Sequence, residues 1–170
     1  MTPFSLHGIG VSNGIAIGKA HLISNALLEV VQYDIEIKDI PHEIKRFEDA
    51  IAAVKIELNK IKSQLPSDSP GELSAFIDTH LMILKDKSLS SLPKTIIEHE
   101  KCNAEWAIKK QMDSVVNQFD QIEDQYLRER KQDVIQVVER VIKILLGHSN
   151  QVAVKNKEKL TILVAHDISP

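Results

Sequence analysis

The middle of the chain carries a long helical pattern of apolar residues. Between residues 44 and 65 the spacing alternates between three and four, which is typical of a heptad seam along one helix. The seam consists of Ile44, Phe47, Ile51, Val54, Leu58, Ile61 and Leu65. Pro41 suits the first turn of such a helix, and Pro66 cannot continue it. The pattern therefore predicts a helix from about residue 41 to residue 65.

Two further helical stretches follow. Ser69, Pro70 and Glu72 have the order of a capping box, which predicts a helix over about 70–85. Helical spacing resumes at Asn103 and continues to residue 146, before Gly147, a typical C-terminal stop. This stretch is long for one globular helix, so we expect a break near residues 119–124.

The two ends of the chain have a different pattern. Four of the six glycines fall between residues 8 and 18, where they separate short apolar runs. We expect strands there, with a turn at residues 12–14, and alternation over 31–37 extends this prediction. The mostly apolar run 160–165 predicts a buried strand. The expected fold is mainly α, an antiparallel helical bundle inserted between two strand-rich ends.

Composition narrows the possible functions. The 170 residues carry a net charge of −3 with a pI near 6.2, which disfavours nucleic acid and anionic membranes as partners. No apolar run reaches the roughly 18–20 residues of a membrane span, and the N-terminus does not resemble a signal peptide. We therefore expect a cytoplasmic chain without membrane insertion.

The residues that could bind metal or act as nucleophiles give weak signals. One cysteine, Cys102, excludes an internal disulfide. Seven histidines include no H-x-x-x-H pair, so we expect no metal site. His166 precedes Asp167 at a strand end, but neighbouring strand residues point to opposite faces, which favours a solvated histidine over a catalytic pair. The glycines at 8–18 match no phosphate-binding loop.

The helix predicted over 70–85 has two apolar stripes. One contains Leu73, Ile77, Leu81 and Leu84, and the other contains Ala75, Phe76, Met82 and Ile83. Such a helix is either buried on all sides or binds a partner with its second face, and the sequence leaves both possibilities open. The carboxylates of Glu72, Asp78 and Asp86 would form an acidic rim suited to a basic partner with an apolar centre.

Five motifs, in order along the chain, resemble the N-terminal part of Enzyme I, the phosphoenolpyruvate-protein phosphotransferase family of the bacterial sugar phosphotransferase system. They are Gly8-x-x-x-Ser12-x-Gly14-x-Ala16-x-Gly18, the segment 75–86, Asn103-Ala104-Glu105-Trp106-Ala107, the segment 124–134 and the segment 164–170. Together they extend over the whole chain.

The resemblance implies an α/β phosphohistidine domain interrupted by a helical subdomain that binds the carrier protein HPr. On this basis we expect strands of the α/β domain over 1–38, the HPr-binding subdomain over 39–148 and the returning α/β segment over 149–170. Members of the family take phosphate from phosphoenolpyruvate onto a histidine and pass it to HPr. The histidine motif follows a segment that resembles 167–170, so we expect this chain to contain no catalytic residue and to be inactive by itself.

The resemblance also implies partners and contact residues. The parent enzyme would be a homodimer through a C-terminal barrel that binds phosphoenolpyruvate and Mg²⁺, and the present residues would hold no cofactor. The positions that match the family's HPr contacts are Glu72, Ala75, Thr79, His80, Met82, Ile83, Asp86, Leu89, Leu127 and Arg130. We expect His80 to serve contact or packing rather than to accept a phosphoryl group.

The chain departs from the family pattern at a few positions. Asn13 replaces the usual turn proline, Lys87 replaces a proline, and Pro93 predicts that a short helix starts late or kinks. Ile135 and Gln136 replace an Arg-Asp pair. Two alternatives stay open, a nitrogen-related Enzyme I paralogue and a non-enzymatic helical adaptor.

Overall fold

The chain forms two compact units. The first comprises residues 1–25 and 153–170, and the second comprises residues 26–152. The computed structural model describes residues 8–11, 13–23 and 161–165 of the first unit, and residues 30–66 and 68–147 of the second. We call these the strand unit and the helical unit.

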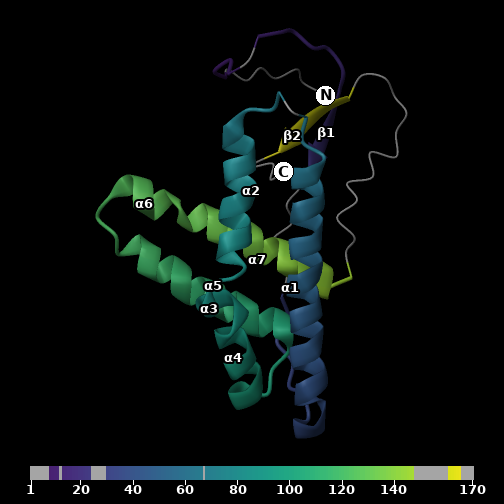
Figure 1. Ribbon diagram of the computed structural model, residues 1–170, viewed down its shortest axis with the longest axis vertical. Coiled ribbons are helices and arrows are strands. Elements are labelled where there is room, and N and C mark those ends of the chain that lie inside the picture. Colours follow the sequence, from purple (N-terminus) through teal and green to yellow (C-terminus); the bar gives the residue numbers. More distant parts are fainter. Residues whose placement is uncertain (1–7, 12, 24–29, 67, 148–160, 166–170) are drawn as a thin grey trace, which may run out of the picture. The chain divides into compact units, whose positions relative to one another are not determined.

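The strand unit contains a pair of parallel strands. Strand β1 (Lys19–Ile23) pairs with β2 (Thr161–Ala165) in a continuous register from Lys19 opposite Thr161 to Ile23 opposite Ala165 (Figure 1). Parallel strands need a crossover connection, and the whole helical unit lies between these two in the sequence. The strand predicted at 160–165 is confirmed over 161–165, but the prediction that it is buried is wrong, because Val164 is 45% exposed and Ile162 is only half-buried. A two-stranded sheet leaves part of each strand's surface uncovered.

The N-terminal strand is shorter than we predicted. Ile15 and Ile17 lie outside β1, and both side chains are exposed. Gly14 adopts a φ of 139°, a conformation that glycine tolerates, which agrees with a turn there. Ser12, the first residue of the predicted turn, lies outside the described residues. Alternation of apolar residues is therefore insufficient for a strand here, since no described segment offers residues 15–17 a hydrogen-bonded partner.

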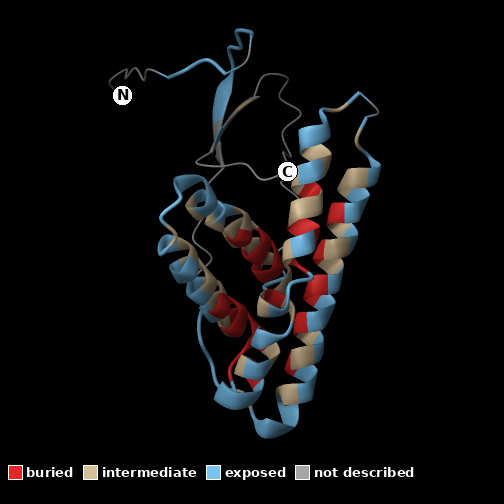
Figure 2. Ribbon diagram, turned by 60° about the vertical axis from the view of Figure 1, so that its left-hand side comes forward, coloured by how far each residue is buried: buried red, intermediate tan, exposed pale blue. Residues whose placement is uncertain are grey.

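Helices make up the second unit. The short turn η1 (Ile37–Asp39) leads into α1 (Ile40–Ser63), followed by α2 (Gly71–Ile83), α3 (Lys87–Ser90), α4 (Leu92–Glu100), α5 (Ala104–Asp120), α6 (Gln125–Glu129) and α7 (Lys131–Leu145). Helix α7 packs against α1, α2 and α5, and α4 packs against α1 and α5. Figure 2 shows the buried residues on the sides where these helices face one another. The mainly helical fold predicted from the sequence is confirmed.

Most of the predicted helix boundaries are confirmed. The heptad seam forms α1, with Phe47, Val54 and Leu58 fully or almost fully buried. The predicted break separates α5 from α6, where the Asp124 carboxylate accepts a hydrogen bond from the Leu127 amide at 2.9 Å. Pro93 lies in the first turn of α4, so that helix starts late, as we predicted.

The predicted capping box does not form. The N-cap of α2 is Pro70, and no side chain caps this end. Ser69 instead donates its backbone N–H to the Pro66 carbonyl, 3.0 Å away, in the turn between the two helices. Because this turn sets the backbone conformation at Ser69, the residue does not occupy the N-cap position.

Residues 31–37 form no regular strand, contrary to the alternation prediction. Asp34 makes an isolated antiparallel bridge with Cys102, and the Ile35 amide donates to the Lys101 carbonyl at 2.8 Å. The Asn103 side chain accepts from the Tyr33 amide at 3.1 Å and donates to the Val31 carbonyl at 3.1 Å. This segment therefore belongs with the helical unit, which starts earlier than the boundary we predicted after residue 38.

A buried ionic cluster joins distant parts of the helical unit. The Arg46 guanidinium donates to both oxygens of Glu105 at 2.7 Å and to both oxygens of Glu43 at 2.6 and 3.1 Å. It also donates to the Leu145 carbonyl at 3.1 Å, and Asn103 donates to Glu105 at 3.0 Å. We call Glu43, Arg46, Asn103 and Glu105 the Arg46 network. Through it, α1 and the start of α5 are bonded to the end of α7.

Hydrogen bonds and charges within the Arg46 network favour the ionised states of Glu105 and Arg46. Burial, the largest single influence, would by itself raise the pKa of Glu105, but the hydrogen bonds from Arg46, from the Glu105 amide and from Asn103, with the charge of Arg46, together outweigh it and hold that pKa below its usual value. The same hydrogen bonds raise the pKa of Arg46. Glu43 also accepts a 2.7 Å hydrogen bond from the Ala104 amide at the start of α5. Each carboxylate is thus hydrogen-bonded to the Arg46 guanidinium and to a second donor, which offsets part of the cost of burying it.

Candidate functional site

Helix α2 buries one face and exposes the other. Ile77, His80, Leu81 and Leu84 are buried against the rest of the helical unit. Met82 keeps 70% of its surface exposed, and Ala75, two helical turns earlier on the same side of α2, is also exposed. Of the two possibilities that the sequence left open, burial on all sides is therefore wrong. The second apolar stripe includes a surface that can receive a partner.

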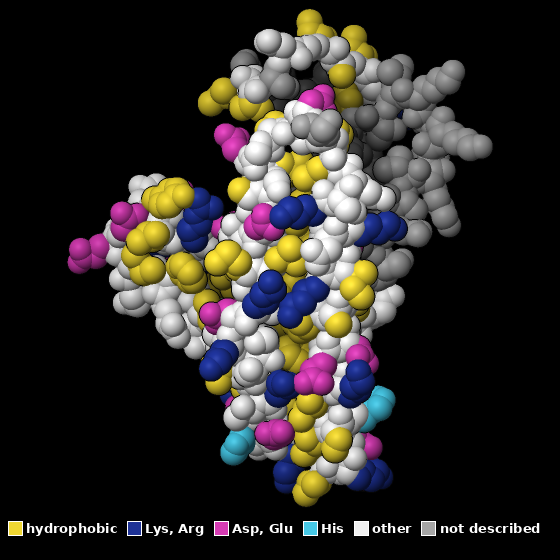
Figure 3. All heavy atoms as spheres, in the orientation of Figure 1, with side chains coloured by type: hydrophobic (Ala, Val, Ile, Leu, Met, Phe, Trp, Pro, Cys, Tyr) yellow, Lys and Arg dark blue, Asp and Glu magenta, His cyan; other side chains and the backbone are white. Residues whose placement is uncertain are grey.

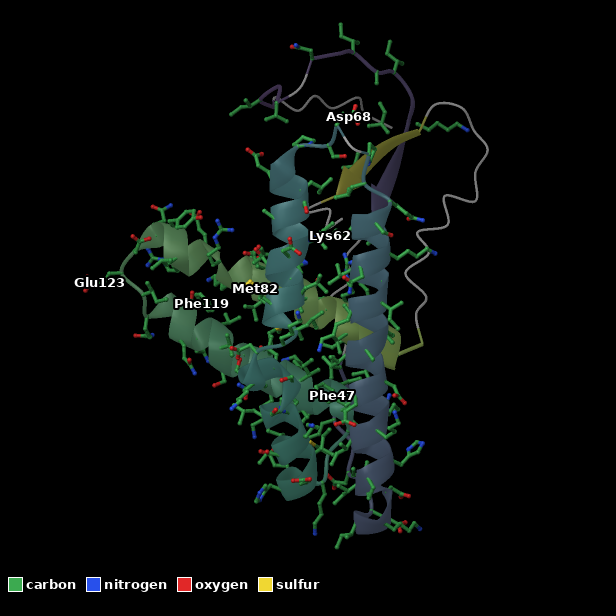
Figure 4. All side chains as sticks on the ribbon, viewed as in Figure 1. Phe47, Lys62, Asp68, Met82, Phe119 and Glu123 are labelled. Carbon is green, nitrogen blue, oxygen red and sulfur yellow. The ribbon has the colours of Figure 1, made fainter. Side chains whose placement is uncertain are left out.

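Helix α6 adds a second apolar surface. Tyr126 and Leu127 are 62% and 48% exposed, although both are large apolar side chains. Figure 3 shows hydrophobic side chains gathered over α6 and along the neighbouring side of α2. In Figure 4, Met82 lies on α2 and Phe119 lies near the end of α5. We call Ala75, Met82, Tyr126 and Leu127 the docking face.

Arg130, at the edge of the docking face, is held by two residues near it in the sequence, Tyr126 and Asp133. Its guanidinium lies 4.6 Å from the centroid of the Tyr126 ring and donates a hydrogen bond to the Tyr126 hydroxyl. It also donates to the Asp133 carboxylate at 3.3 Å. Stacking on Tyr126 keeps the aromatic ring and the cation together at the surface. The pKa of Arg130 is raised, first by its hydrogen bond to Tyr126 and then by that to Asp133.

The predicted acidic rim is present only in part. Glu72 and Asp86 are exposed, but the Asp78 carboxylate accepts two hydrogen bonds from the Lys62 ammonium at 2.6 and 2.7 Å. Asp86 caps α3 by accepting from the Ser88 amide at 2.8 Å, and its hydrogen bonds from the Ser88 side chain and amide lower its pKa. Two of the three predicted rim carboxylates are thus already bonded within the chain.

Two residues of the predicted contact set are not at the surface. His80 is only 1% exposed and Leu89 only 2%. The His80 ring stacks on Phe76 with centroids 4.2 Å apart, and no hydrogen-bond partner of either ring nitrogen exists among the described residues. Desolvation lowers the pKa of His80, against the attraction of Asp133. The prediction that these two side chains meet a partner directly is therefore wrong, while packing, the other role expected for His80, agrees with its burial.

The remaining predicted residues lie on two sides of the docking face. Glu72, Ala75, Thr79, Met82, Ile83 and Asp86 belong to α2 and its exit, and Leu127 and Arg130 belong to α6 and its end. Thr79 and Ile83 are half-buried. The Thr79 hydroxyl donates to the Ala75 carbonyl at 3.0 Å, which turns it along the helix. Sequence reasoning missed Tyr126 as a surface residue, because its apolar spacing placed it on the core stripe.

Among the described residues we looked for a metal-binding cluster and for a membrane-spanning helix. Within the described ranges, no three His, Cys, Asp or Glu side chains gather where they could hold a metal ion. No helix among those residues combines the length and apolar character that a membrane span requires. The chemistry available at the docking face is that of protein contact, with an apolar centre and charged edges.

Comparison with known proteins agrees with this geometry. Residues 7–130 match the family described as PEP-utilising enzyme, N-terminal. The phosphoenolpyruvate-protein phosphotransferase of Cupriavidus necator is 46% identical over 99% of this chain, and that of Listeria monocytogenes is 33% identical over 97%. The chain spans only 30% and 28% of the lengths of these two relatives.

Solved structures show the same fold. A solution structure of Enzyme I, named nEIt, matches with a TM-score of 0.74 and 29% identity, over 94% of this chain and 64% of that one. The N-terminal domain of a nitrogen Enzyme 1 matches with a TM-score of 0.70 over 92% of this chain and 63% of that one, and at 23% identity it supports the fold alone. With its match over residues 7–130, the chain belongs to the PEP-utilising enzyme N-terminal family, and it is similar to the N-terminal part of Enzyme I proteins that are named phosphoenolpyruvate-protein phosphotransferase.

Proposed function

We propose that the helical unit binds the phosphocarrier HPr through the docking face. In this proposal the parent enzyme transfers phosphate from phosphoenolpyruvate through a histidine to HPr, for sugar uptake. The resemblance assigns the accepting histidine and the Mg²⁺-binding barrel to segments outside residues 1–170. The contribution of this chain is then to hold HPr where the histidine can reach it, since positioning supplies much of the catalysis in phosphoryl transfer.

The exposure of Met82 is the observation that carries the proposal. A methionine at 70% exposure on an otherwise well-packed helix leaves apolar area in water. Tyr126 and Leu127 extend this area on α6. Apolar centres of this kind, flanked by aromatic and arginine side chains, are typical of interface hot spots. Flexible methionine adapts its shape to a partner surface.

The proposed contact residues follow from exposure and from the family resemblance together. They are Glu72, Ala75, Thr79, Met82, Ile83, Asp86, Leu127 and Arg130. His80 and Leu89 are left out because they are buried. Tyr126 is added, since it is exposed and bonded to Arg130. No residue of this set is proposed to accept phosphate.

Replacement of Ala75 by tryptophan tests the proposal. The bulky ring would stand on the same side of α2 as Met82, two helical turns away and within the proposed contact, so we expect HPr to bind about 30-fold more weakly, which corresponds to about 2 kcal/mol. Isothermal titration with HPr measures the effect, and circular dichroism checks that the helices are intact.

Ala52→Trp is the matched control. Ala52 is an exposed alanine on α1, outside the docking face, so the same change in volume there should leave the affinity for HPr unaltered. Equal affinities of the wild-type chain and Ala75→Trp, with both folded, would contradict docking at this face. The nitrogen-related and adaptor alternatives are less favoured, because the relatives at 46% and 33% identity are named phosphoenolpyruvate-protein phosphotransferase.

A further inference from the structure

The strand unit contains an exposed Asn-Gly pair ahead of β1. Asn13 and Gly14 are both exposed, and within the described ranges no hydrogen bond involves the Asn13 side chain or the Gly14 amide nitrogen. Gly14 has a φ of 139°, and nothing lies within 4 Å of the point where a Cβ on this residue would stand. The pair therefore has both the open space and the free groups that a reaction between them requires.

The covalent structure of this pair brings two reactive groups together. The Gly14 nitrogen can reach the amide carbon of the Asn13 side chain, Cγ, by closing a ring through the Asn13 backbone, and attack within one molecule is far more effective than attack between two. A glycine makes the approach easiest, because it has no Cβ to crowd its nitrogen or to restrict φ. Asparagine is also one of the thermolabile residues. An Asn-Gly pair in an open turn is therefore prone to lose its side-chain amide.

The other described asparagines are protected by hydrogen bonds. Asn59 and Asn117 lie inside α1 and α5, where the backbone N–H that follows each of them takes part in the helix. Asn103 is buried in the Arg46 network, and the next amide in the chain donates to Glu43 at 2.7 Å. In each case the nitrogen that would have to attack is already bonded. The local structure thus singles out Asn13 among the asparagines that the structure describes.

We propose that Asn13 is a site of spontaneous deamidation. The Gly14 nitrogen bonds to the Asn13 Cγ and gives up its proton, while the bond from Cγ to Nδ2 breaks and ammonia leaves with that proton. The product is a cyclic succinimide. Water then opens the ring at either carbonyl, which leaves an aspartate or an isoaspartate at position 13. Water is the only co-reactant, and no atom is oxidised or reduced.

Deamidation changes the strand unit in two ways. Either product adds one carboxylate, so the formal net charge of −3 becomes more negative by one unit. In the isoaspartate the backbone runs through the side-chain carbon, which lengthens the turn before β1 begins at Lys19. An enzyme that methylates isoaspartyl carboxylates is the kind of partner that recognises this second product. The docking face belongs to the helical unit, so the inference does not depend on HPr binding.

Tryptic peptide mapping of the purified chain, after incubation in neutral buffer at physiological temperature, tests the proposal. The peptide of residues 1–19 contains one asparagine and no glutamine, so a mass gain from amide to acid in it reports Asn13 alone. We expect this gain to accumulate as fast in the folded chain as in the chain unfolded by guanidinium chloride, whereas Asn103 should convert only after unfolding. An isoaspartyl methyltransferase with a labelled methyl donor detects the isoaspartate.

Gly14→Ala is the matched variant. A Cβ at position 14 crowds the attacking nitrogen, so we expect deamidation of Asn13 to slow about tenfold. Gly10→Ala is the control, because Gly10 is also exposed with nothing near its Cβ position, and the rate should stay as in the wild type. Equal rates in the wild type and Gly14→Ala would overturn the proposal. Much slower conversion of Asn13 in the folded chain than in the unfolded one would also overturn it, because the turn would then protect the amide.

Discussion

Large apolar residues are buried in the helical unit but exposed in the strand unit. Phe47, Val54 and Ile77 in the helical unit are completely buried, whereas Ile15 and Val11 in the strand unit are 96% and 95% exposed. Helices with heptad or amphipathic patterns can cover one another's apolar faces within a single unit. A pair of parallel strands has two faces and two edges that need to be covered. In β2, Val164 is 45% exposed.

This difference indicates where the stability of the chain lies. The buried core residues of the described chain all lie between residues 47 and 142, so we expect the helical unit to fold without the strand pair. Pairing of β1 with β2 requires residues 19–23 and 161–165 to meet, and the whole helical unit separates them. Two-stranded sheets are marginal by themselves. The predictions below use this contrast, from the largest expected effect to the smallest.

Truncation of Phe47 should unfold the helical unit at much lower denaturant concentration. Phe47 is fully buried on the α1 seam, and Phe47→Ala leaves a cavity that costs about 3–5 kcal/mol of unfolding free energy. Urea titration followed by helical circular dichroism measures the loss. Ile56→Ala on the same helix is the control, since Ile56 is 69% exposed and its truncation should change little.

Hydrogen exchange of Phe47→Ala tests whether the two units unfold independently. Amides of α1 and α7 should lose protection by the amount that the unit is destabilised, while amides of β1 and β2 should exchange as in the wild type. A parallel loss of protection in β1 and β2 would show that the two units unfold together, contrary to the independence inferred here.

Removal of the Arg46 cation should have the next largest effect. In Arg46→Met, the buried Glu43 and Glu105 carboxylates face each other without a cation, which we expect to cost about 2–3 kcal/mol at pH 7. The contribution of Glu105 to stability exists above the ordinary carboxyl pKa and is lost as the pH falls through its lowered value. The difference between wild type and variant should therefore shrink in acid.

Lys94→Met provides the comparison for a surface ion pair. Lys94 and Glu48 approach to 2.9 Å on the solvent side of α4 and α1, and pairs of this type contribute under about 1 kcal/mol. Thermal and urea unfolding at pH 7 and pH 4 would measure both variants. Equal losses for Arg46→Met and Lys94→Met at pH 7 would show that the Arg46 network adds nothing beyond an ordinary surface contact.

A smaller effect should come from His80. Its pKa is lowered, first by desolvation, so below its ordinary value of about 6.5 the unfolded chain binds more protons than the folded one. Stability of the helical unit should therefore be complete above that pH and fall as the pH drops toward the lowered value. One titrating group limits the slope to about 1.4 kcal/mol per pH unit.

His80→Leu isolates this contribution. Leucine fills a buried position without a titrating ring, so unfolding free energy measured between pH 5 and pH 7.5 should lose part of its slope. An unchanged slope in His80→Leu would mean that His80 keeps the same protonation in the folded and unfolded chain.

Sequence patterns predicted features that depend on local spacing. The α1 seam and the break before α6 follow from apolar periodicity and from the limits on helix length. His80 lies three residues after Ile77 and four before Leu84, on the buried side of α2, although we assigned it to neither apolar stripe and the family resemblance placed it among the contact residues. In this case, the spacing was the better guide to burial.

Features that depend on distant pairs were not predicted. Glu43 and Arg46 read as ordinary surface charges on a helix, and Glu105 lies 59 residues beyond Arg46. Only the packing of α1 against the start of α5 brings them together. The exposure of Tyr126 could not be predicted either, because α6 is a short helix at a corner where the apolar stripe of α5 no longer faces the core.

The Arg46 network has a consequence for how the helical unit can be exchanged between proteins. Asn103 holds the incoming segment at Tyr33, and Arg46 holds the outgoing end of α7 at Leu145, so one cluster secures both places where the chain enters and leaves. Segments whose ends lie close together are those that tolerate excision and insertion into a host chain. We therefore expect that the helical unit could be inserted as one segment between two adjacent strands of another protein without disruption of its core.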